Sequence, residues 1–279
     1  MPLIFVPTPL GNLRDVTLRA LDVLREADLV VAEDTRVARR LLQALKIEGR
    51  EIWSYREQNA PRVTQGILER ARTGLVAVTS DAGTPGICDP GSDLAAAARA
   101  AGIAIEVLPG PSAAVGVALL SGFPLRTFTF EGFPPRASSA RRERYRAALR
   151  HEVTSLWFET PQRILASLAD LAAIAPDARL FLVREYTKLH EQQLCGTPQE
   201  VAAALPDPVR GEIAFAIAPY RAARTPGDPT AAIDALLASG ERVGEVAKQL
   251  AAQGFGDRRA LYQRAAKRKA GPKAPLKQR

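Results

Sequence analysis

Cysteine and histidine are both scarce in this chain of 279 residues. The chain has two cysteines, Cys88 and Cys195, and two histidines, His151 and His190. Two distant cysteines cannot form the disulfide framework typical of small secreted proteins, so the sequence predicts a reducing compartment. The same scarcity leaves no convincing set of metal ligands, and we expect no metal site.

Long apolar runs are missing as well. No apolar stretch approaches the roughly 20 residues needed to cross a bilayer. The opening residues 1–7, MPLIFVP, lack the basic flank and the long apolar segment of a secretion signal. The sequence therefore predicts a soluble protein of the cytoplasm.

Several common catalytic and nucleotide-binding motifs are absent. The sequence has no G-x-G-x-x-G after its first predicted strand, no Walker A motif and no G-x-S-x-G nucleophile elbow. His190-Glu191 is followed by Gln-Gln-Leu, so the zinc motif H-E-x-x-H fails at its second histidine. Nucleophilic catalysis by a Ser–His pair is not ruled out by the sequence, but no motif favours it. These absences favour chemistry that needs neither a protein nucleophile nor a metal.

Positive charge is abundant but unevenly distributed. The net charge is +8, and residues 258–279 hold nine Lys or Arg and no acid. The rest of the chain has 29 basic and 30 acidic residues, a net charge of −1. A second basic cluster comprises Arg136, Arg141, Arg142, Arg144, Arg146 and Arg150, with Glu143 as its only acid. Concentrated positive charge attracts polyanions, so nucleic acid is the first candidate partner and an anionic membrane surface the second.

Short apolar runs alternate with helical patterns along the chain. Residues 3–6, 29–32, 75–78 and 103–108 are predicted strands separated by helical periodicity. This alternation predicts a mainly parallel sheet with helices on both faces, and Asp15 and Thr17 are good caps for the first helix.

The pattern changes after 121–124, and a second α/β domain is expected. Its predicted strands are 127–130, 154–158, 180–183, 189–195 and 213–217, with helices at 138–149 and after Pro161. We expect 189–195 to pair with 180–183.

The remaining sequence is a linker and three helices. Residues 221–230 have a linker composition, and helices are predicted near 231–238, 243–252 and 258–269. The expected organisation is an N-terminal α/β domain (1–122), a second α/β domain (123–222), a helical RNA-associated module (229–270) and a disordered basic tail (271–279).

Two loops rich in glycine and proline follow predicted strands. They are SDAGTPGICDPG at 80–91 and PGPSAA at 109–114. Open α/β sheets bind ligands at the carboxyl ends of their strands. Glycine lets the backbone approach a ligand closely, and proline fixes the turn in advance. We therefore expect the chain to hold a small polar ligand against its main chain.

These loops belong to an ordered series of motifs that resembles the tetrapyrrole-methylase superfamily of S-adenosylmethionine (SAM)-dependent methyltransferases. The matching segments are Val6–Leu13 with Asp15, Ala32–Arg36, Ser80–Gly91, Pro109–Ala113, Glu131–Phe133, Glu159–Arg163, Arg184–Lys188 and Gly196–Pro198. Each motif is weak alone, but the series covers about residues 3 to 265. Within the superfamily, the chain is similar to the bacterial enzymes that methylate the 2′-hydroxyl of a cytidine in 16S ribosomal RNA.

The resemblance implies an α/β fold of two tetrapyrrole-methylase-type domains, with the active site in the cleft between them and a small C-terminal helical module. It implies SAM as cofactor, 16S ribosomal RNA of the small subunit as partner, and a homodimer. The residues that it places in the SAM pocket are Leu10, Asp81, Thr84, Ser112, Ala113 and Phe158.

The catalytic candidates are Lys188, Glu33, Asp34 and Glu185, taken from the matching motifs. A positioned base, or a cation that lowers the pKa of the 2′-hydroxyl, would help the attacking oxygen. Lys188 is the main candidate, because partial desolvation in a cleft would favour its neutral form. The expected RNA-binding residues are Arg36, Arg136, Arg141, Arg142, Arg144, Arg258, Arg259 and Lys267.

Simpler structural roles compete with these assignments. Asp81 could anchor its own turn, and Asp34 could serve as a helix cap with no catalytic role. Lys188 and Glu185 could form a surface ion pair, and the arginine cluster could be a solvated helix face. Two departures from the family pattern also stand out. Arg56 and Gln58 occupy a stretch that usually has histidines, and Tyr186 stands where leucine is usual.

Two other functions stay open. The first keeps the fold but methylates a tetrapyrrole or another small molecule. The second is a non-catalytic protein that binds the ribosome. The regular loop at 80–86 argues against the second, because a chain freed from SAM binding need not retain it.

Overall fold

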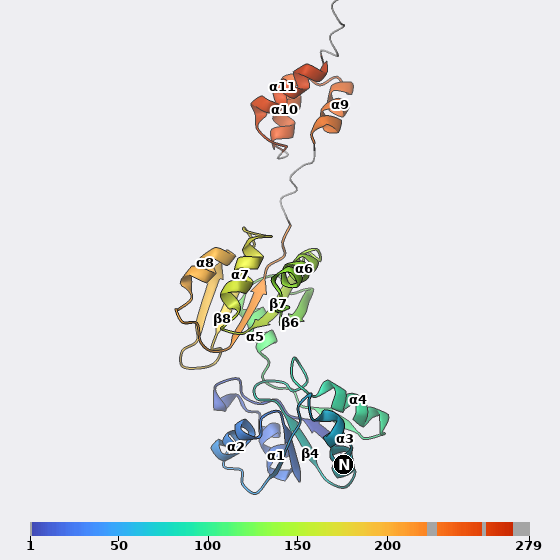
Figure 1. The fold of residues 1–279 in the computed structure, drawn as a ribbon, viewed down its shortest axis with the longest axis vertical. Coiled ribbons are helices and arrows are strands. Elements are labelled where there is room, and N and C mark those ends of the chain that lie inside the picture. The colour runs from blue at the N-terminus through green and yellow to red at the C-terminus, as the bar shows by residue number, and fades with distance from the viewer. Residues whose placement is uncertain (1, 222–227, 253–254, 270–279) are drawn as a thin grey trace, which may run out of the picture. The chain divides into compact units, whose positions relative to one another are not determined.

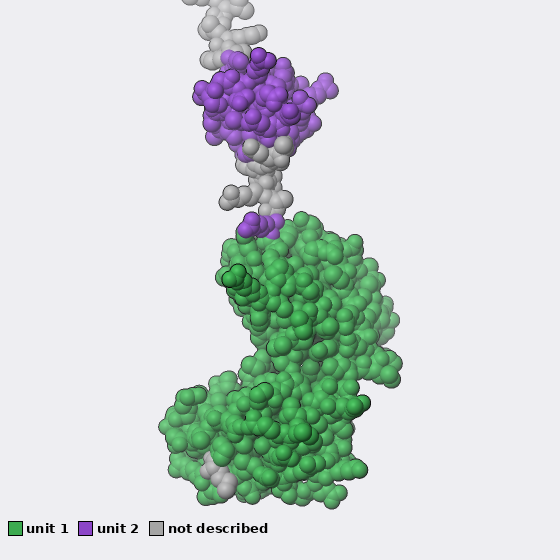
Figure 2. Space-filling model, turned by 180° about the vertical axis from the view of Figure 1, so that it is seen from behind, with its two compact units in different colours: residues 1–220 green, residues 221–279 purple. Residues whose placement is uncertain are grey.

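The structure is a computed structural model that describes residues 2–221, 228–252 and 255–269. The chain forms two compact units, residues 1–220 (unit 1) and 221–279 (unit 2), shown in Figures 1 and 2. In the described residues, none of the helices combines the length and apolarity that crossing a membrane requires.

The first sheet of unit 1 is entirely parallel, as the sequence predicted. Its strands lie in the order β3-β2-β4-β1-β5. The strands are β1 (Leu3–Phe5), β2 (Leu29–Ala32), β3 (Glu51–Ser54), β4 (Val76–Thr79) and β5 (Ile105–Val107). Strands β1, β2 and β4 are buried along their whole length, because helices cover both faces of the sheet.

Five helices and one short 3-10 turn accompany this sheet. They are η1 (Leu13–Asp15), α1 (Leu18–Glu26), α2 (Thr35–Ala44), α3 (Ala60–Thr73), α4 (Ser92–Ala100) and α5 (Ala113–Leu120). The hydroxyl of Thr17 caps α1 by accepting from the Ala20 N–H at 3.1 Å, as predicted. Asp15 lies in η1 instead of capping α1.

The second sheet of unit 1 is mixed. Its order is β6-β7-β10-β8-β9, and only β6 and β7 run parallel. The strands are β6 (Phe128–Gly132), β7 (Thr154–Glu159), β8 (Leu180–Arg184), β9 (Gln192–Gly196) and β10 (Ile213–Ile217). The expected pairing of the β9 segment with β8 is confirmed.

Two apolar clusters hold the second sheet in place. In one cluster, the buried Trp157 and Phe215 of the sheet pack against Tyr145 of helix α6 (Ser138–Leu149). The helices α7 (Ile164–Ala172) and α8 (Pro198–Ala204) also belong to this cluster. In the other, α5 packs Val117 and Ala118 against the sheet. The last helix before residue 122 therefore packs on the second sheet and links the two halves of unit 1.

The described part of unit 2 forms a bundle of three helices. These are α9 (Thr230–Ala238), α10 (Val243–Ala252) and α11 (Arg258–Lys269), which confirms the three predicted helices. Their core consists of buried apolar residues from all three, including Ile233, Val246 and Leu261. The tail predicted at 271–279 lies outside the described residues.

Candidate functional site

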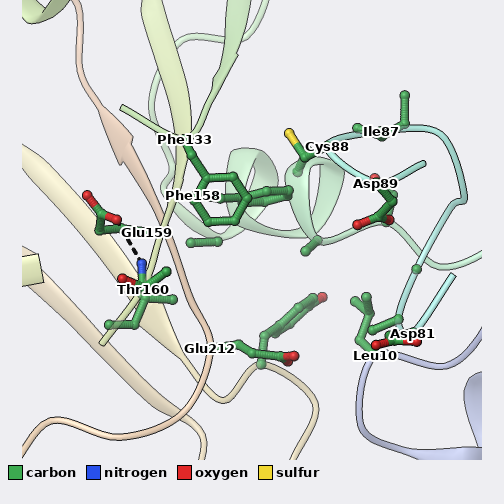
Figure 3. Close-up of a pocket in the computed structure, with 18 of the residues that line it drawn as sticks. Leu10, Asp81, Ile87, Cys88, Asp89, Phe133, Phe158, Glu159, Thr160 and Glu212 are labelled. Carbon is green, nitrogen blue, oxygen red and sulfur yellow. Dashed lines mark hydrogen bonds between the residues drawn. The ribbon is translucent and has the colours of Figure 1, made fainter. Parts of the chain in front are cut away.

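A cavity of about 360 Å³ lies in unit 1, where the loops at the ends of the strands of both sheets meet. Figure 2 shows the surface of unit 1 hollowed between its two lobes, and Figure 3 shows the cavity from close by. One wall consists of Leu10, Glu33, residues 81–84, 87–89 and 112–114. The other consists of Phe133, residues 158–161, Val183, Tyr186 and residues 211–214.

All six residues expected to bind the cofactor line this one cavity. They are Leu10, Asp81, Thr84, Ser112, Ala113 and Phe158. They come from segments separated by up to half of the chain, and only the fold brings them together.

The loop after β4 is held rigidly by its neighbours. Thr8 and Gly83 exchange two backbone hydrogen bonds of 2.9 and 3.0 Å, and the Thr84 hydroxyl donates to the Pro111 carbonyl at 3.0 Å. Gly83 has a φ of +78°, and a Cβ built there would lie 3.1 Å from Leu10 Cδ2. A side chain at residue 83 would therefore be strained and would press on the cavity wall.

Carboxylates dominate the charge around the cavity. Glu33, Asp81, Asp89 and Glu212 all line it. Burial, followed by the nearby carboxylates, raises the pKa of Glu33 and that of Asp81. Burial and then the charge of Glu33 raise the pKa of Asp89 to about 7. Crowded, partly desolvated carboxylates are stabilised by a positive charge, so the cavity favours a cationic ligand.

Asp89 should make the stability of the unliganded protein depend on pH. Its pKa in the folded protein, about 7, exceeds the ordinary value of 3.8. The folded state therefore holds a proton that the unfolded state has released between about pH 4 and 7, and stability is lost as the pH rises through this window. Asp89→Asn should consequently have a higher melting temperature than the wild type at pH 8, and the difference should shrink toward pH 4. Calorimetric melting across this range checks the prediction, and a constant difference would contradict it.

Only one of the four expected catalytic residues, Glu33, lines the cavity. Asp34 caps α2 by accepting from the Arg36 N–H at 2.8 Å, and it also pairs with the Arg36 guanidinium at 2.6 Å. These contacts hold the pKa of Asp34 well below its usual range. The Asp34 N–H donates to Asp81 Oδ1 at 3.2 Å. The structure thus gives Asp34 the capping role that competed with catalysis in the sequence.

Lys188 lies behind the cavity wall in a double ion pair. Its Nζ is 2.9 Å from Glu185 Oε1 and 3.0 Å from Glu212 Oε2. Burial lowers the pKa of Lys188, but the two carboxylates outweigh burial and leave the pKa above its ordinary value. The expectation of a neutral Lys188 is therefore wrong. Lys188 is a cation because Glu185 and Glu212 both pair with it; the sequence suggested the pair with Glu185 but not the one with Glu212.

Glu185 serves mainly as a support for this lysine. It has a φ of +57° and accepts from both Lys188 Nζ and the Glu212 N–H, the latter at 2.9 Å. Although burial raises the pKa of Glu185, these hydrogen bonds outweigh it and lower the pKa overall. Glu185 is thus an ionised partner that orients Lys188 and the start of β10.

Sequence reasoning gave no role to several residues of the cavity. Asp89 and Phe133 belong to motifs that were recognised, but no role was assigned to their side chains. Glu212 lies in no recognised motif, and its only signal is a glycine before it and a strand after it. Tyr186 was noted only as a departure from the family pattern, yet it lines the cavity.

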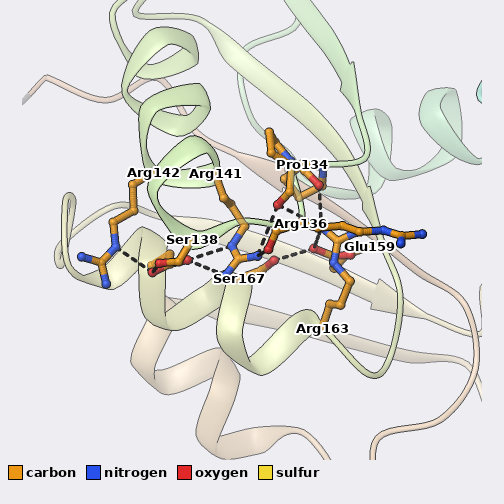
Figure 4. A network of polar contacts seen from close by, with 10 residues as sticks. Pro134, Arg136, Ser138, Arg141, Arg142, Glu159, Arg163 and Ser167 are labelled. Carbon is orange, nitrogen blue, oxygen red and sulfur yellow. Dashed lines mark hydrogen bonds and ion pairs between the residues drawn. The ribbon is translucent and has the colours of Figure 1, made fainter.

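The assignment of Arg141 to RNA binding is wrong. Arg141 is 5% exposed, and its guanidinium bonds the equally buried Asp170 of α7 through Nε at 2.8 Å. It also donates to the carbonyls of Pro135 and Arg136, at 3.3 and 2.9 Å. Figure 4 shows this network, in which Arg163 likewise donates to the Pro134 carbonyl. Two arginines therefore fix the loop between β6 and α6, and Arg141 is not available to RNA.

The other expected RNA-binding residues are at least partly accessible. In unit 1, Arg136 is exposed, Arg142 pairs with Asp170, and Arg144 pairs with Glu131. Arg36, paired with Asp34, has a side chain that is 77% exposed. In unit 2, the exposed candidates are Arg258, Arg259 and Lys267 of α11. The structure allows contact with a polyanion at these positions.

Comparison with known proteins gives a consistent result. Residues 2–202 match the family of tetrapyrrole (corrin/porphyrin) methylases. A protein named ribosomal RNA small subunit methyltransferase I from Neisseria meningitidis serogroup B is 40% identical over 263 residues, which cover 92% of this chain and 90% of that protein. Proteins of the same name from Synechocystis and Thermotoga maritima are 37% and 41% identical, covering 94% and 71% of this chain and 96% and 89% of their own lengths.

The fold also resembles a solved structure. The crystal structure of a diphthine synthase superposes with a TM-score of 0.62 at 16% identity, covering 78% of this chain and 90% of that one. At this identity the likeness concerns the fold alone.

Proposed function

Because the chain belongs to the tetrapyrrole (corrin/porphyrin) methylase family, we propose that it is a SAM-dependent methyltransferase that modifies ribosomal RNA of the small subunit. The observation that carries this proposal is the 40% identity, over 92% of the chain, to a ribosomal RNA small subunit methyltransferase. We further propose that the acceptor is the ribose 2′-hydroxyl of a cytidine in 16S ribosomal RNA.

The cavity suits SAM as its ligand. SAM carries a sulfonium and an ammonium group, and the carboxylates of Glu33, Asp81 and Glu212 line the cavity. The backbone near Gly83 leaves room that a Cβ would fill. We propose that the six residues named above, from Leu10 to Phe158, hold the cofactor, with Phe158 supplying apolar surface and Ser112 a hydroxyl.

The proposed methyl transfer depends on alignment of the reacting atoms more than on covalent catalysis by a protein side chain. When bound, SAM supplies a methyl group on a positively charged sulfur that departs as a neutral thioether. The rigid loops would hold the acceptor oxygen in line with this methyl group, and such alignment supplies much of the rate of a displacement. Glu33, whose pKa is raised, is the candidate to take the proton of the hydroxyl. Lys188, held by Glu185, would stabilise the negative charge that develops on the oxygen.

Accessible basic residues on both units would hold the RNA. We propose that Arg36, Arg136, Arg142, Arg144, Arg258, Arg259 and Lys267 contact phosphates, because each neutralised phosphate releases counterions and strengthens binding. Such contacts orient the RNA without reading its sequence. The small ribosomal subunit as substrate would place the protein in the cytoplasm.

We also propose that the protein is a homodimer. Val115 and Leu119 of α5 are 64% and 76% exposed, and their i, i+4 spacing places them on one helix face. Leu119→Glu should shift the protein from dimer to monomer in sedimentation velocity experiments. Leu18→Glu, at an 80% exposed leucine of α1, is the control. A wild-type protein that sediments as a monomer would contradict the proposal.

A labelling experiment tests the proposed function. The protein is mixed with SAM labelled in its methyl group and with small ribosomal subunits isolated from a bacterium that lacks this modification. Label in the 16S RNA, mapped to a single 2′-O-methylcytidine, is the expected result. Label in a tetrapyrrole but not in RNA would instead support a small-molecule methyltransferase. The absence of SAM binding in calorimetry would support a non-catalytic protein.

A further inference from the structure

Two large apolar side chains stand half-exposed on the wall of the cavity. Ile87, from the loop after β4, and Phe133, from the loop after β6, are each 48% exposed. They come from different sheets. Exposed apolar surface inside a binding site costs free energy until a ligand covers it, so these side chains indicate a ligand with an apolar face.

The two loops touch each other directly. The contact lies between Gly132, at the end of β6, and the Cys88 side chain. Gly132 has a φ of +67°, and a Cβ built there would lie 3.1 Å from Cys88 Sγ. The loops can approach this closely because residue 132 has no side chain. Ile87 and Asp89 on one wall thus adjoin Phe133 on the other wall at the same end of the cavity, with Cys88 between them in Figure 3.

The Phe158 ring packs against the Phe133 ring and fixes its orientation. The two rings meet edge to face, with ring centroids 5.8 Å apart, and Phe158 makes a second such contact with Phe130 at 5.1 Å. The Pro134 carbonyl accepts from Arg163 and the Pro135 carbonyl from Arg141, so the chain after Phe133 is fixed as well. A ring held in this way is a preformed stacking surface.

We propose that Ile87, Asp89 and Phe133 form the binding site for the base of the acceptor nucleotide, which is turned out of the RNA helix. This inference rests on the proposed RNA methylation. A cavity of about 360 Å³ cannot admit a helix, so a ribose that reaches it must leave the base stack. The extruded base would stack on Phe133, contact Ile87 and hydrogen-bond the Asp89 carboxyl.

Asp89 has the chemistry to bind the edge of a base. Its protonated carboxyl can donate to the ring N3 of cytosine and accept from the N4 amino group, whereas the ionised form can only accept. Carboxylates face it from three directions: Glu33 after β2, Asp81 after β4 and Glu212 before β10. Together with burial they keep the pKa of Asp89 near 7, so the protonated form is populated at neutral pH. RNA binding should then weaken as the pH rises from 6 to 8.5.

The stacking role is tested with Phe133→Ala and a matched control. The measurements are the KM for small ribosomal subunits and the Kd for SAM. Stacking of one base on an aromatic ring predicts that KM rises about 10- to 100-fold, with the SAM Kd changed less than about threefold. Phe128→Ala is the control, because Phe128 lies on β6, the strand that precedes Phe133, is 44% exposed and is not among the cavity residues. A large rise in the SAM Kd, or equal KM values for the two variants, would overturn the inference.

The Asp89 contact is tested with a pair of variants. Asparagine can donate and accept like the protonated acid, whereas leucine can do neither. Asp89→Leu should therefore raise the KM for subunits by about 10-fold or more, and Asp89→Asn should recover much of this loss while abolishing the rise of KM with pH. An asparagine variant as impaired as the leucine variant would overturn the role. Wild-type protein that labels no subunits would refute the proposed function itself, a result distinct from either failure here.

Discussion

Arg141→Met should lower the free energy of unfolding of the protein by about 3 kcal/mol, the lower end of the loss from breaking a buried ion pair, because Asp170 would keep only the half-exposed Arg142 and the Ser138 hydroxyl as partners. Arg141 and Asp170 have side chains that are 6% and 5% exposed. The substitution also removes the donors to the Pro135 and Arg136 carbonyls. Urea denaturation at neutral pH, followed by circular dichroism, measures the loss.

The neighbouring arginine provides the control. Arg142 bonds the same carboxylate of Asp170, with Nε 2.6 Å from Oδ1, but its side chain is 44% exposed. Arg142→Met should therefore cost about 1 kcal/mol or less, as exposed ion pairs do. Equal losses for the two variants would show that burial does not decide the difference. A stable Arg141→Met protein that binds RNA poorly would restore the RNA-binding role rejected above.

Lys188→Met should lower kcat about 100- to 1,000-fold, the effect of removing one group that stabilises developing charge in a transition state. The lysine is held close to the cavity from two sides. Glu185 and Glu212 bind its Nζ, and its stem lies under the opening loop, where a Cβ on Gly11 would be 2.2 Å from Lys188 Cγ. Single-turnover methylation of small subunits at saturating SAM measures the effect.

The values of kcat and of the SAM Kd in a second variant, Lys188→Arg, identify the role of Lys188. An electrostatic role predicts that Lys188→Arg recovers part of kcat, because arginine keeps the positive charge, and that the SAM Kd changes little. A role as neutral base predicts no recovery by arginine. Lys46→Met, at an exposed lysine after α2, is the control. Turnover of Lys188→Met near that of the wild type would remove this lysine from the mechanism.

Much of unit 1 could be predicted because its signals are local. The strands β1, β2, β4 and β10 are continuous apolar runs, and the capping residue Thr17 immediately precedes α1. Helix α6 was predicted with its observed bounds. In contrast, β3 and α3 were missed. The edge strand β3 is only half-buried, with Glu51 and Ser54 at its ends, and therefore has no continuous apolar run.

The sequence predicted which residues would line the cavity as the cofactor site, but it did not predict the charge states of the ionisable side chains around them. The motifs identified Leu10, Asp81 and Ser112 because each occupies a loop with a recognisable pattern of glycine and proline. Their shared cavity follows from the parallel sheet, which brings the ends of its strands to one edge. The sequence also contained Asp89 and Phe133, but nothing local distinguished them from other loop residues.

The sequence by itself determined most of the strands and helices, the family and the loops that build the cavity, because apolar periodicity and turn residues act over short distances. Only the tertiary structure decided which charges are buried and paired. Arg141 meets Asp170 across 29 residues, and Lys188 meets Glu212 across 24. The charge state and accessibility of an ionisable side chain depend on such distant neighbours and on the water they displace.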